Sequence, residues 1–246
     1  MDSLTTAAAS GMRSRLEALD LLANNIANAS APAFKADREF YSQYVSAEAA
    51  GVPPSTEAAT LPVVERNWTD FSQGTLVPTG NPLDVALTGK GFLVASGPSG
   101  TLYTRAGGFH LSPQGELQTQ DGYPVQDSNG KPIQVDPSKP VEIALDGSVR
   151  QDGQELSRIA LVDFQDSSAL TKRGYAYFSS DSSAPQPSAA TVQLQQGKLE
   201  SANVQPAETA VRLVGVMRQF EMLQRALSIG ADMNKRALDE VARISG

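Results

Sequence analysis

The sequence predicts an α+β fold in which long N- and C-terminal helices pack together as a coiled-coil-like layer beside an all-β middle module. Two observations predict this class. Apolar residues recur at steps of three and four near both ends of the chain, and short alternating runs separated by Gly-containing turns fill the middle. We therefore expect a terminal helical assembly domain (1–34 with 205–246), an extended connector (35–80), a β module (81–190) and a return segment (191–204).

The C-terminal helix is predicted from a stripe of apolar positions that follows Pro206, a residue suited to a first helical turn. Acidic and basic residues four apart support the helix, as in Glu221–Arg225 and Asp239–Arg243. Gly230 and Asn234 interrupt the stripe. At 1.5 Å per residue the helix would be roughly 55–60 Å long and would need partners along its length. We expect it to present an assembly interface at Val216, Phe220, Leu223, Leu227, Val241 and Ile244.

A second helix is predicted over residues 2–28, where a thin apolar stripe contains several alanines. Asn-rich sequence followed by Pro32 marks its end. The stripe fits an assembly surface, but it fits equally well an ordinary amphipathic helix that packs on its own domain. The candidate interface residues in this part of the chain are Leu16, Leu19, Ala23, Asn24, Asn25, Ile26, Asn28 and Phe34.

Composition and charge exclude several classes of protein. The 246 residues include no cysteine, so disulfides and thiolate metal sites are excluded. The net charge is −7, with the acidic excess in the middle and no cluster of Lys or Arg, which argues against nucleic-acid binding. The first twenty residues lack the basic and apolar regions of a cleavable signal peptide, and no run approaches the ~18 apolar residues of a membrane span. We expect neither membrane insertion nor a cleaved signal.

The end of the first helix carries a recognisable motif. Segment 21–40, LLANNIANASAPAFKADREF, resembles the N-terminal motif of flagellar axial proteins, the rod and hook family. The residues that match are Leu22, Ala23, Asn24, Asn25, Ile26, Ala27, Asn28, Phe34, Lys35 and Arg38. Ala33 stands where the family usually has Gly, which leaves the turn after the helix uncertain, although Pro32 could supply a different rigid turn.

The predicted β module carries the most specific resemblance. Segment 102–125, LYTRAGGFHLSPQGELQTQDGYPV, matches the family at Tyr103, Thr104, Arg105, Gly107, Phe109, Gly115 and Leu117. Segments 69–87 and 194–208 also resemble the family, the latter through Gly197, Leu199, Glu200, Ser201, Asn203, Val204 and Glu208. These matches occur in the family's order and extend over most of the chain.

The resemblance implies a structural subunit of the bacterial flagellar basal-body rod that has no cofactor and no enzymatic activity. The Arg218–Met222 run is most similar to the proximal-rod members of the family. The implied partners are further copies of itself, neighbouring proximal- and distal-rod subunits, and the flagellar type III export apparatus. The implied location is the rod in the periplasmic space, where helical polymerisation would form a shaft that transmits torque.

Three other interpretations remain open at this stage. The chain could be a distal-rod or hook-type protein, a soluble coiled-coil oligomer, or a secreted β-rich glycan-binding module or hydrolase with a helical tail. A hydrolase could use Asp84, Glu155 or Asp163, although nothing in the sequence brings two of them together. Asp84 is interpreted as an outward-facing strand residue, and the sole histidine, His110, alternates with apolar neighbours, which argues against a catalytic triad.

Overall fold

The computed structural model describes residues 3–45, 60–180, 188–189 and 192–244, and it divides the chain into two compact units. The first, here called the helical unit, comprises Met1–Ala27, Asp37–Trp68 and Gln205–Gly246. The second, the β unit, comprises Asn28–Ala36 and Thr69–Val204. The chain therefore passes between the two units four times.

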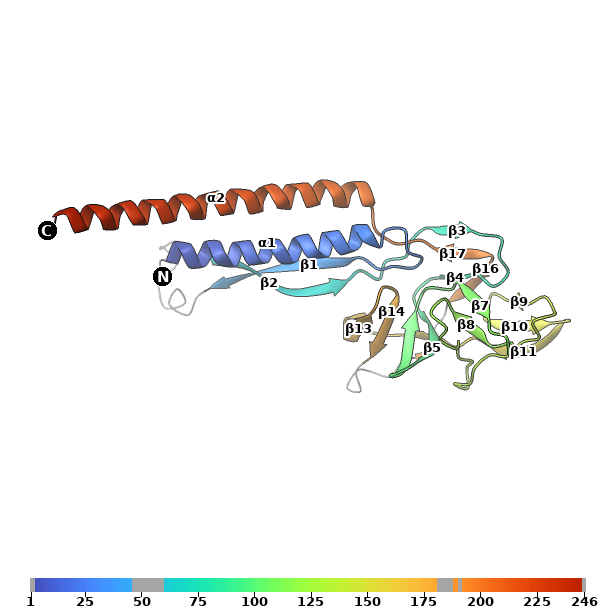
Figure 1. Ribbon diagram of the computed structural model, residues 1–246. Helices are drawn as coiled ribbons and strands as arrows, with labels where there is room; N and C mark the ends of the chain where they lie inside the picture. The colour runs from blue at the N-terminus through green and yellow to red at the C-terminus, as the bar shows by residue number, and fades with distance from the viewer. Residues whose placement is uncertain (1–2, 46–59, 181–187, 190–191, 245–246) are drawn as a thin grey trace. The chain divides into compact units, whose positions relative to one another are not determined.

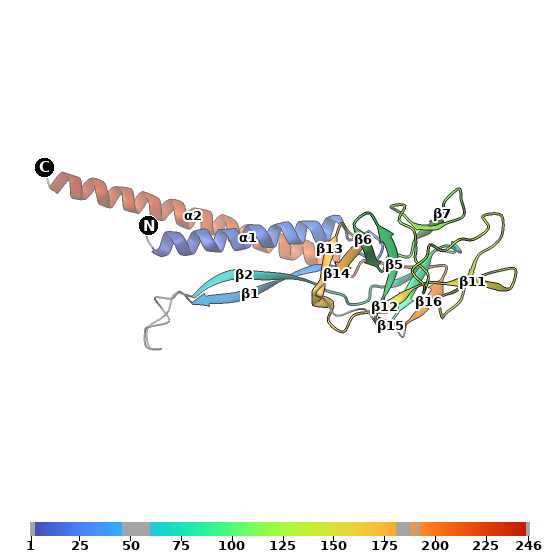
Figure 2. The same cartoon turned by 90° about the horizontal axis from the view of Figure 1, so that it is seen from below.

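The helical unit contains two helices and a two-stranded ribbon. Helix α1 (Ser3–Ala27) lies alongside α2 (Pro206–Ile244), and strands β1 (Asp37–Val45) and β2 (Thr60–Thr69) pair with each other beside α1 (Figures 1 and 2). Pro206 occupies the first turn of α2, where its missing N–H costs nothing. The helices approach closely at Gly11, where an added Cβ would lie 3.6 Å from Cδ1 of Leu223.

The prediction of a coiled-coil-like layer is wrong. On α2 the half-buried apolar positions end at Leu227, and every described side chain between 228 and 236 is exposed. In the sequence, Gly230 and Asn234 interrupt the apolar stripe in this part of α2, so residues 228–236 offer little apolar surface on the side of the half-buried positions. Among the α1 side chains that the structure describes, residues 9–27, the buried positions are Ser14, Ala18, Leu22 and Asn25, rather than a leucine-rich seam.

The helical unit also contains a β-ribbon that the sequence did not predict. Both β1 and most of β2 belong to it, although the stretch 35–80 was predicted as an extended connector. Trp68, the one tryptophan of the sequence, lies in this stretch and is 46% exposed. Across the described residues, the structure has two α-helices and many short strands. The mixture of helix and strand is as expected, whereas the helical layer is not.

The β unit is built from short strands in several small sheets. Its strands are β3 (Leu76–Pro78), β4 (Val85–Thr88), β5 (Phe92–Gly97), β6 (Gly100–Thr104), β7 (Phe109–Leu111), β8 (Leu117–Thr119), β9 (Glu142–Ile143), β10 (Ser148–Gln151), β11 (Gln154–Arg158), β12 (Leu161–Asp163), β13 (Leu170–Arg173), β14 (Tyr177–Ser180), β15 (Ser188–Ala189), β16 (Gln193–Gln196) and β17 (Lys198–Glu200). The largest sheet has the order β13-β14-β6-β5-β12-β15. A three-stranded sheet has the order β11-β10-β9, and the pairs β16-β4, β17-β3 and β7-β8 complete the unit.

Two apolar clusters hold the β unit together. The larger is aliphatic and is built around Val85, Leu117 and Leu194, none of which is exposed. The smaller is aromatic, and Phe71 packs edge-on against it, with ring centroids 5.4 Å from Phe92 and 4.9 Å from Phe178. Phe71 thus anchors the start of the second β-unit segment.

Candidate functional site

The residues predicted as an assembly interface differ in their burial. Leu16, Ala23 and Asn24 are exposed, whereas Asn25 and Phe34 are buried within the chain's own fold. The half-buried members are Leu19, Ile26, Asn28, Val216, Phe220, Leu223 and Leu227. Val241 and Ile244 belong to α2, but their side chains lie outside the described part of the structure.

Asn25 explains part of the asparagine-rich motif at the end of α1. Its side-chain amide donates to the carbonyl of Asp37 at 2.8 Å and accepts the N–H of the same residue at 3.0 Å. The amide therefore pairs with the first residue of β1 as a neighbouring strand would. Helix α2 is tied to the same strand by Arg212, whose guanidinium lies 3.2 Å from the carboxylate of Glu39.

The β-module motif proves to be internal. All seven of its predicted residues are buried: Tyr103, Thr104, Arg105, Gly107, Phe109, Gly115 and Leu117. The hydroxyl of Thr104 donates to the carbonyl of Ala176 at 2.7 Å. A Cβ at Gly107 would lie 1.9 Å from the carbonyl oxygen of Val85, so only glycine fits there. The motif thus specifies the packing of the β unit.

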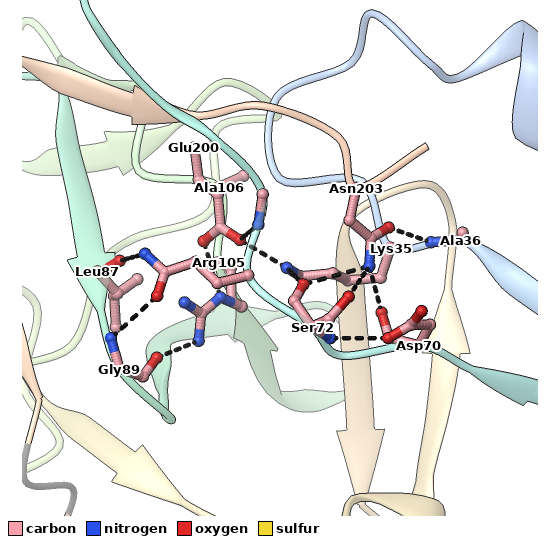
Figure 3. A network of polar contacts seen from close by, with 12 residues as sticks. Lys35, Ala36, Asp70, Ser72, Leu87, Gly89, Arg105, Ala106, Glu200 and Asn203 are labelled. Carbon is pink, nitrogen blue, oxygen red and sulfur yellow. Dashed lines mark hydrogen bonds and ion pairs between the residues drawn. The ribbon is translucent and has the colours of Figure 1, made fainter. Parts of the chain in front are cut away.

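Three charged residues from three separate motifs meet inside the β unit (Figure 3). Lys35 Nζ lies 2.6 Å from Oε1 of Glu200, and Arg105 Nε lies 2.8 Å from Oε2. The exposed fractions of these side chains are 0% for Lys35, 0% for Glu200 and 3% for Arg105. We refer to Lys35, Arg105 and Glu200 as the buried triad.

The triad carries two cations for one carboxylate, and backbone oxygens accommodate the excess positive charge. Lys35 Nζ donates to the carbonyl of Ser72 at 2.6 Å. Arg105 Nη1 donates to the carbonyls of Gly89 at 3.1 Å and Gly91 at 2.8 Å. Burial lowers the pKa of Lys35, and the charge of Glu200 offsets part of this change. Buried ions arranged in this way require every partner, because an unpaired member would be costly.

Glu200 also fixes the backbone of a neighbouring loop. The N–H of Gly74 donates to its Oε1 at 2.9 Å. A Cβ at Gly74 would lie 2.0 Å from the carbonyl oxygen of Ser201, so the loop can approach this closely only through glycine. This close approach is the structural reason for Gly74 in the 69–87 motif.

Asn203 links three chain segments that lie next to the crossings between the units. Its Oδ1 accepts the N–H of Ala36 at 2.8 Å, and its Nδ2 donates to the carbonyl of Asp70 at 2.7 Å. The N–H of Asp70 in turn donates to the carbonyl of Ala36 at 2.8 Å. Within the β unit, the segments that adjoin the crossings at 36/37, 68/69 and 204/205 are thus bonded to one another.

Sequence reasoning missed this arrangement. Lys35, Glu200 and Asn203 were each noticed as members of a motif, but no role was assigned to them. The available signal was the opposite charge of residues in motifs far apart along the chain. Arg105 was predicted as a motif residue, and the structure gives it a partner 95 residues away.

The residues considered for catalysis do not form a reactive centre in the described structure. The interpretation of Asp84 as outward-facing is wrong, because it is 7% exposed and accepts a hydrogen bond from Asn81 at 3.0 Å. Glu155 contacts Arg158 at 3.4 Å on the surface. His110 is half-buried on β7, where it pairs with Gln118 across the hairpin. Among the described residues, no three His, Cys, Asp or Glu side chains are grouped to hold a metal.

The fold and the site together define a structural protein, in which the buried residues of the most distinctive motifs position backbone and core. Residues 86–154 match the family described as "Flagellar hook protein FlgE/F/G D1 domain". Residues 195–240 match "Flagellar basal body rod FlgEFG protein C-terminal". The chain belongs to the flagellar basal-body rod protein family and is most like FlgF.

Curated relatives extend the match to nearly the whole chain. The chain is 34% identical over 236 residues to the basal-body rod protein FlgF of Caulobacter vibrioides, covering 92% of this chain and 93% of that protein. It is 32% identical to FlgF of Mesorhizobium japonicum, with 82% and 83% covered. It is 30% identical to FlgG of Caulobacter vibrioides, with 95% and 97% covered. The protein is therefore a structural subunit of the flagellar rod that assembles with other rod proteins.

A membrane-spanning role for the helices finds no support in the described residues, where neither helix combines sufficient length with sufficient apolar character.

Proposed function

We propose that this chain is a proximal-rod subunit that polymerises into the helical drive shaft carrying motor torque to hook and filament. Its similarity to FlgF relatives supports the proximal position. The structural observation that carries the proposal is a row of exposed apolar side chains on α2. Such a row on a long helix is typical of a surface that a partner covers.

This exposed stripe lies on the side of α2 away from the half-buried positions. Val211, Met222, Ile229 and Met233 are 74%, 60%, 60% and 65% exposed. At 100° per residue, these four fall within roughly 40° of one another around the helix, and Phe220 lies roughly opposite. Helix α2 thus has apolar residues on two faces, one towards its own unit and one towards solvent.

A neighbouring subunit is the proposed occupant of the exposed stripe. Full burial of one such side chain contributes roughly 1.5–3 kcal/mol, so four together are a substantial driving force for association. The exposed stripe and the exposed residues Leu16, Ala23 and Asn24 are two different surfaces of the chain. A contact between these two surfaces on neighbouring subunits would therefore be heterologous. Heterologous contacts that do not close generate an open helical assembly, which is the form a rod requires.

The proposal includes the route and the neighbours of the subunit. It travels unfolded through the flagellar type III export apparatus, keeps its N-terminus uncleaved, and joins proximal- and distal-rod subunits in the periplasmic space. It has no catalytic activity, binds no nucleic acid and does not insert into the membrane. The acidic middle of the chain supports the exclusion of nucleic acid.

The test compares two substitutions of equal charge on α2. Ile229→Asp places a carboxylate in the exposed stripe, whereas Gln224→Asp changes an exposed polar position on the same helix. In a flagellated host that lacks its own copy of the gene, we expect Gln224→Asp to restore swimming and Ile229→Asp not to. Mass spectrometry of purified hook–basal bodies should detect the Gln224→Asp chain and its N-terminal peptide, and little of the Ile229→Asp chain. Equal incorporation of both would contradict the proposed surface.

A further inference from the structure

A cavity of about 410 Å³ lies in the β unit among residues that the buried triad does not use. Its walls come from the turn between β5 and β6, the turn after β8, and the turn between β13 and β14. This volume falls within the roughly 300–1,000 Å³ that small-molecule sites occupy. The cavity is thus large enough for a small ligand.

Three tyrosines give the cavity an aromatic wall. Tyr177 stands between the other two, with ring centroids 5.4 Å from Tyr123 and 6.2 Å from Tyr175 in edge-to-face arrangements. Tyr177 is buried, while Tyr123 and Tyr175 are half-buried and retain accessible surface. Leu102 adds an aliphatic contact to the same wall.

Two opposite charges line the cavity beside the tyrosines. Asp121 is exposed, and its Oδ2 accepts the hydroxyl of Tyr177 at 2.7 Å. The hydroxyl of Tyr175 is protonated at neutral pH, as in an ordinary tyrosine, and burial and the nearby Asp121 raise its pKa further. Arg173 is also exposed, and its Nε donates to the hydroxyl of Ser179 at 3.1 Å. The cavity therefore offers a carboxylate acceptor, guanidinium donors and hydroxyl groups around an aromatic surface.

From this combination we propose that the cavity binds a neutral saccharide of one or two rings. A sugar ring presents an apolar C–H face, suited to Tyr175 and Tyr123, and a rim of hydroxyls that both donate and accept hydrogen bonds. Arg173 would repel a cationic ligand, and Asp121 would repel an anionic ligand. A neutral, polyhydroxylated ligand uses both charges without repulsion.

A peptide fits the cavity less well than a sugar does. Peptides that add to a sheet need the open edge of a strand for their backbone. Here the walls come from turns and from β6, β13 and β14, and β6 and β14 each have paired neighbours on both sides. The saccharide site is independent of rod assembly, since none of its residues lies on α1 or α2.

The site can be tested on the full-length protein by NMR titration with cellobiose and with N,N′-diacetylchitobiose. We expect saturable shifts of the resonances of Leu102 and Gly174 with at least one of the two sugars. Tyr175→Ala should weaken binding by about tenfold, the loss expected for one aromatic contact. Tyr175→Phe, which keeps an aromatic ring, should retain most of the wild-type affinity. Asp121→Asn should weaken binding by a similar factor. Asp152→Asn, in a different cavity of the β unit, is the matched control and should leave the affinity unchanged.

The proposal would be overturned by either of two results. One is the absence of saturable shifts with both sugars up to about 50 mM, a concentration that would reveal even weak binding. The other is binding that Tyr175→Ala and Asp121→Asn leave unchanged while both variants keep the wild-type spectrum elsewhere. Neither result bears on the assembly surface of α2, so failure of the saccharide site and failure of the proposed rod function are distinguishable.

Discussion

Replacing Glu200 by glutamine removes the negative charge of the buried triad while keeping the size of the side chain. In the native protein its two oxygens accept from Lys35 Nζ at 2.6 Å, Gly74 N–H at 2.9 Å and Arg105 Nε at 2.8 Å. Glutamine can still accept through one oxygen. Its NH2 group, however, would face a second donor, and Lys35 and Arg105 would lose the buried carboxylate that they share.

The expected cost follows from the burial of all three side chains. Breaking a buried ion pair by removing one partner costs about 3–5 kcal/mol, because the remaining charge stays out of water. For a unit of this size, each kcal/mol lowers the melting temperature by about 2–4 °C, so we expect Glu200→Gln to lower it by roughly 6–20 °C.

The assay is thermal unfolding of the full-length chain by circular dichroism, with hydrogen exchange and mass spectrometry to assign the loss to peptides of the β unit. Glu155→Gln is the matched control, because it makes the same chemical change in a pair that is about half exposed and 3.4 Å long. Exposed pairs contribute about 0–1 kcal/mol, so the control should melt close to wild type.

A double-mutant cycle distinguishes loss of charge pairing from general disruption. Adding Lys35→Met to Glu200→Gln removes one of the stranded cations, so the double variant should lose less stability than the sum of the single variants, by about 0.5–3 kcal/mol. If Glu200→Gln melts within 1 °C of Glu155→Gln, or if the two triad substitutions are additive, the reasoning about the triad is refuted.

Three further predictions concern single positions. Gly107→Ala should destabilise the β unit by about 3 kcal/mol or more in urea unfolding, because its Cβ would lie 1.9 Å from the Val85 carbonyl oxygen; a loss below 1 kcal/mol would contradict this. Gly215→Ala, with open space around its Cβ, should stabilise α2 by up to about 1 kcal/mol and slow amide exchange there; faster exchange would count against it. Hydrogen bonds from the Lys131 N–H and neighbouring groups lower the pKa of Asp127, so its stabilising contribution is present above its unfolded-state pKa and lost as pH falls. When the pH falls from 7 to 3, the Asp127→Asn variant should therefore lose less stability than the wild type. Urea titrations that show an equal loss for the two proteins would exclude this role.

Local sequence signals predicted many of the strands. The alternating residues Phe109–Leu111 predict a strand with the bounds of β7, and Gly115 in the turn between β7 and β8 has a φ of 84°, which glycine tolerates without strain. The alternating run 157–164 predicts one strand, whereas the structure divides it between β11 and β12. Such features depend on neighbours a few residues apart, which is why composition and alternation identify them.

Long-range features could not be predicted in the same way. Nothing local to Lys35 indicates a partner 165 residues away, and the ionic pairing follows only once the strands are placed. The β1–β2 ribbon was missed because the intervening stretch is rich in Ala and Pro and suggests a connector. On α1 the alanine-rich sequence allows several faces to be buried, so only the packing of the helical unit decides that Leu22 rather than Leu16 is covered.

The bonding around Asn203 has a mechanical consequence. The three segments that it joins leave the β unit within a few residues of the hydrogen bonds between Ala36, Asp70 and Asn203. A tension applied to one of these strands is therefore passed to the other two before it reaches the core. The three connections would therefore resist stretching together rather than independently. Their stiffness would add, and no single peptide segment would carry the whole load of a turning motor.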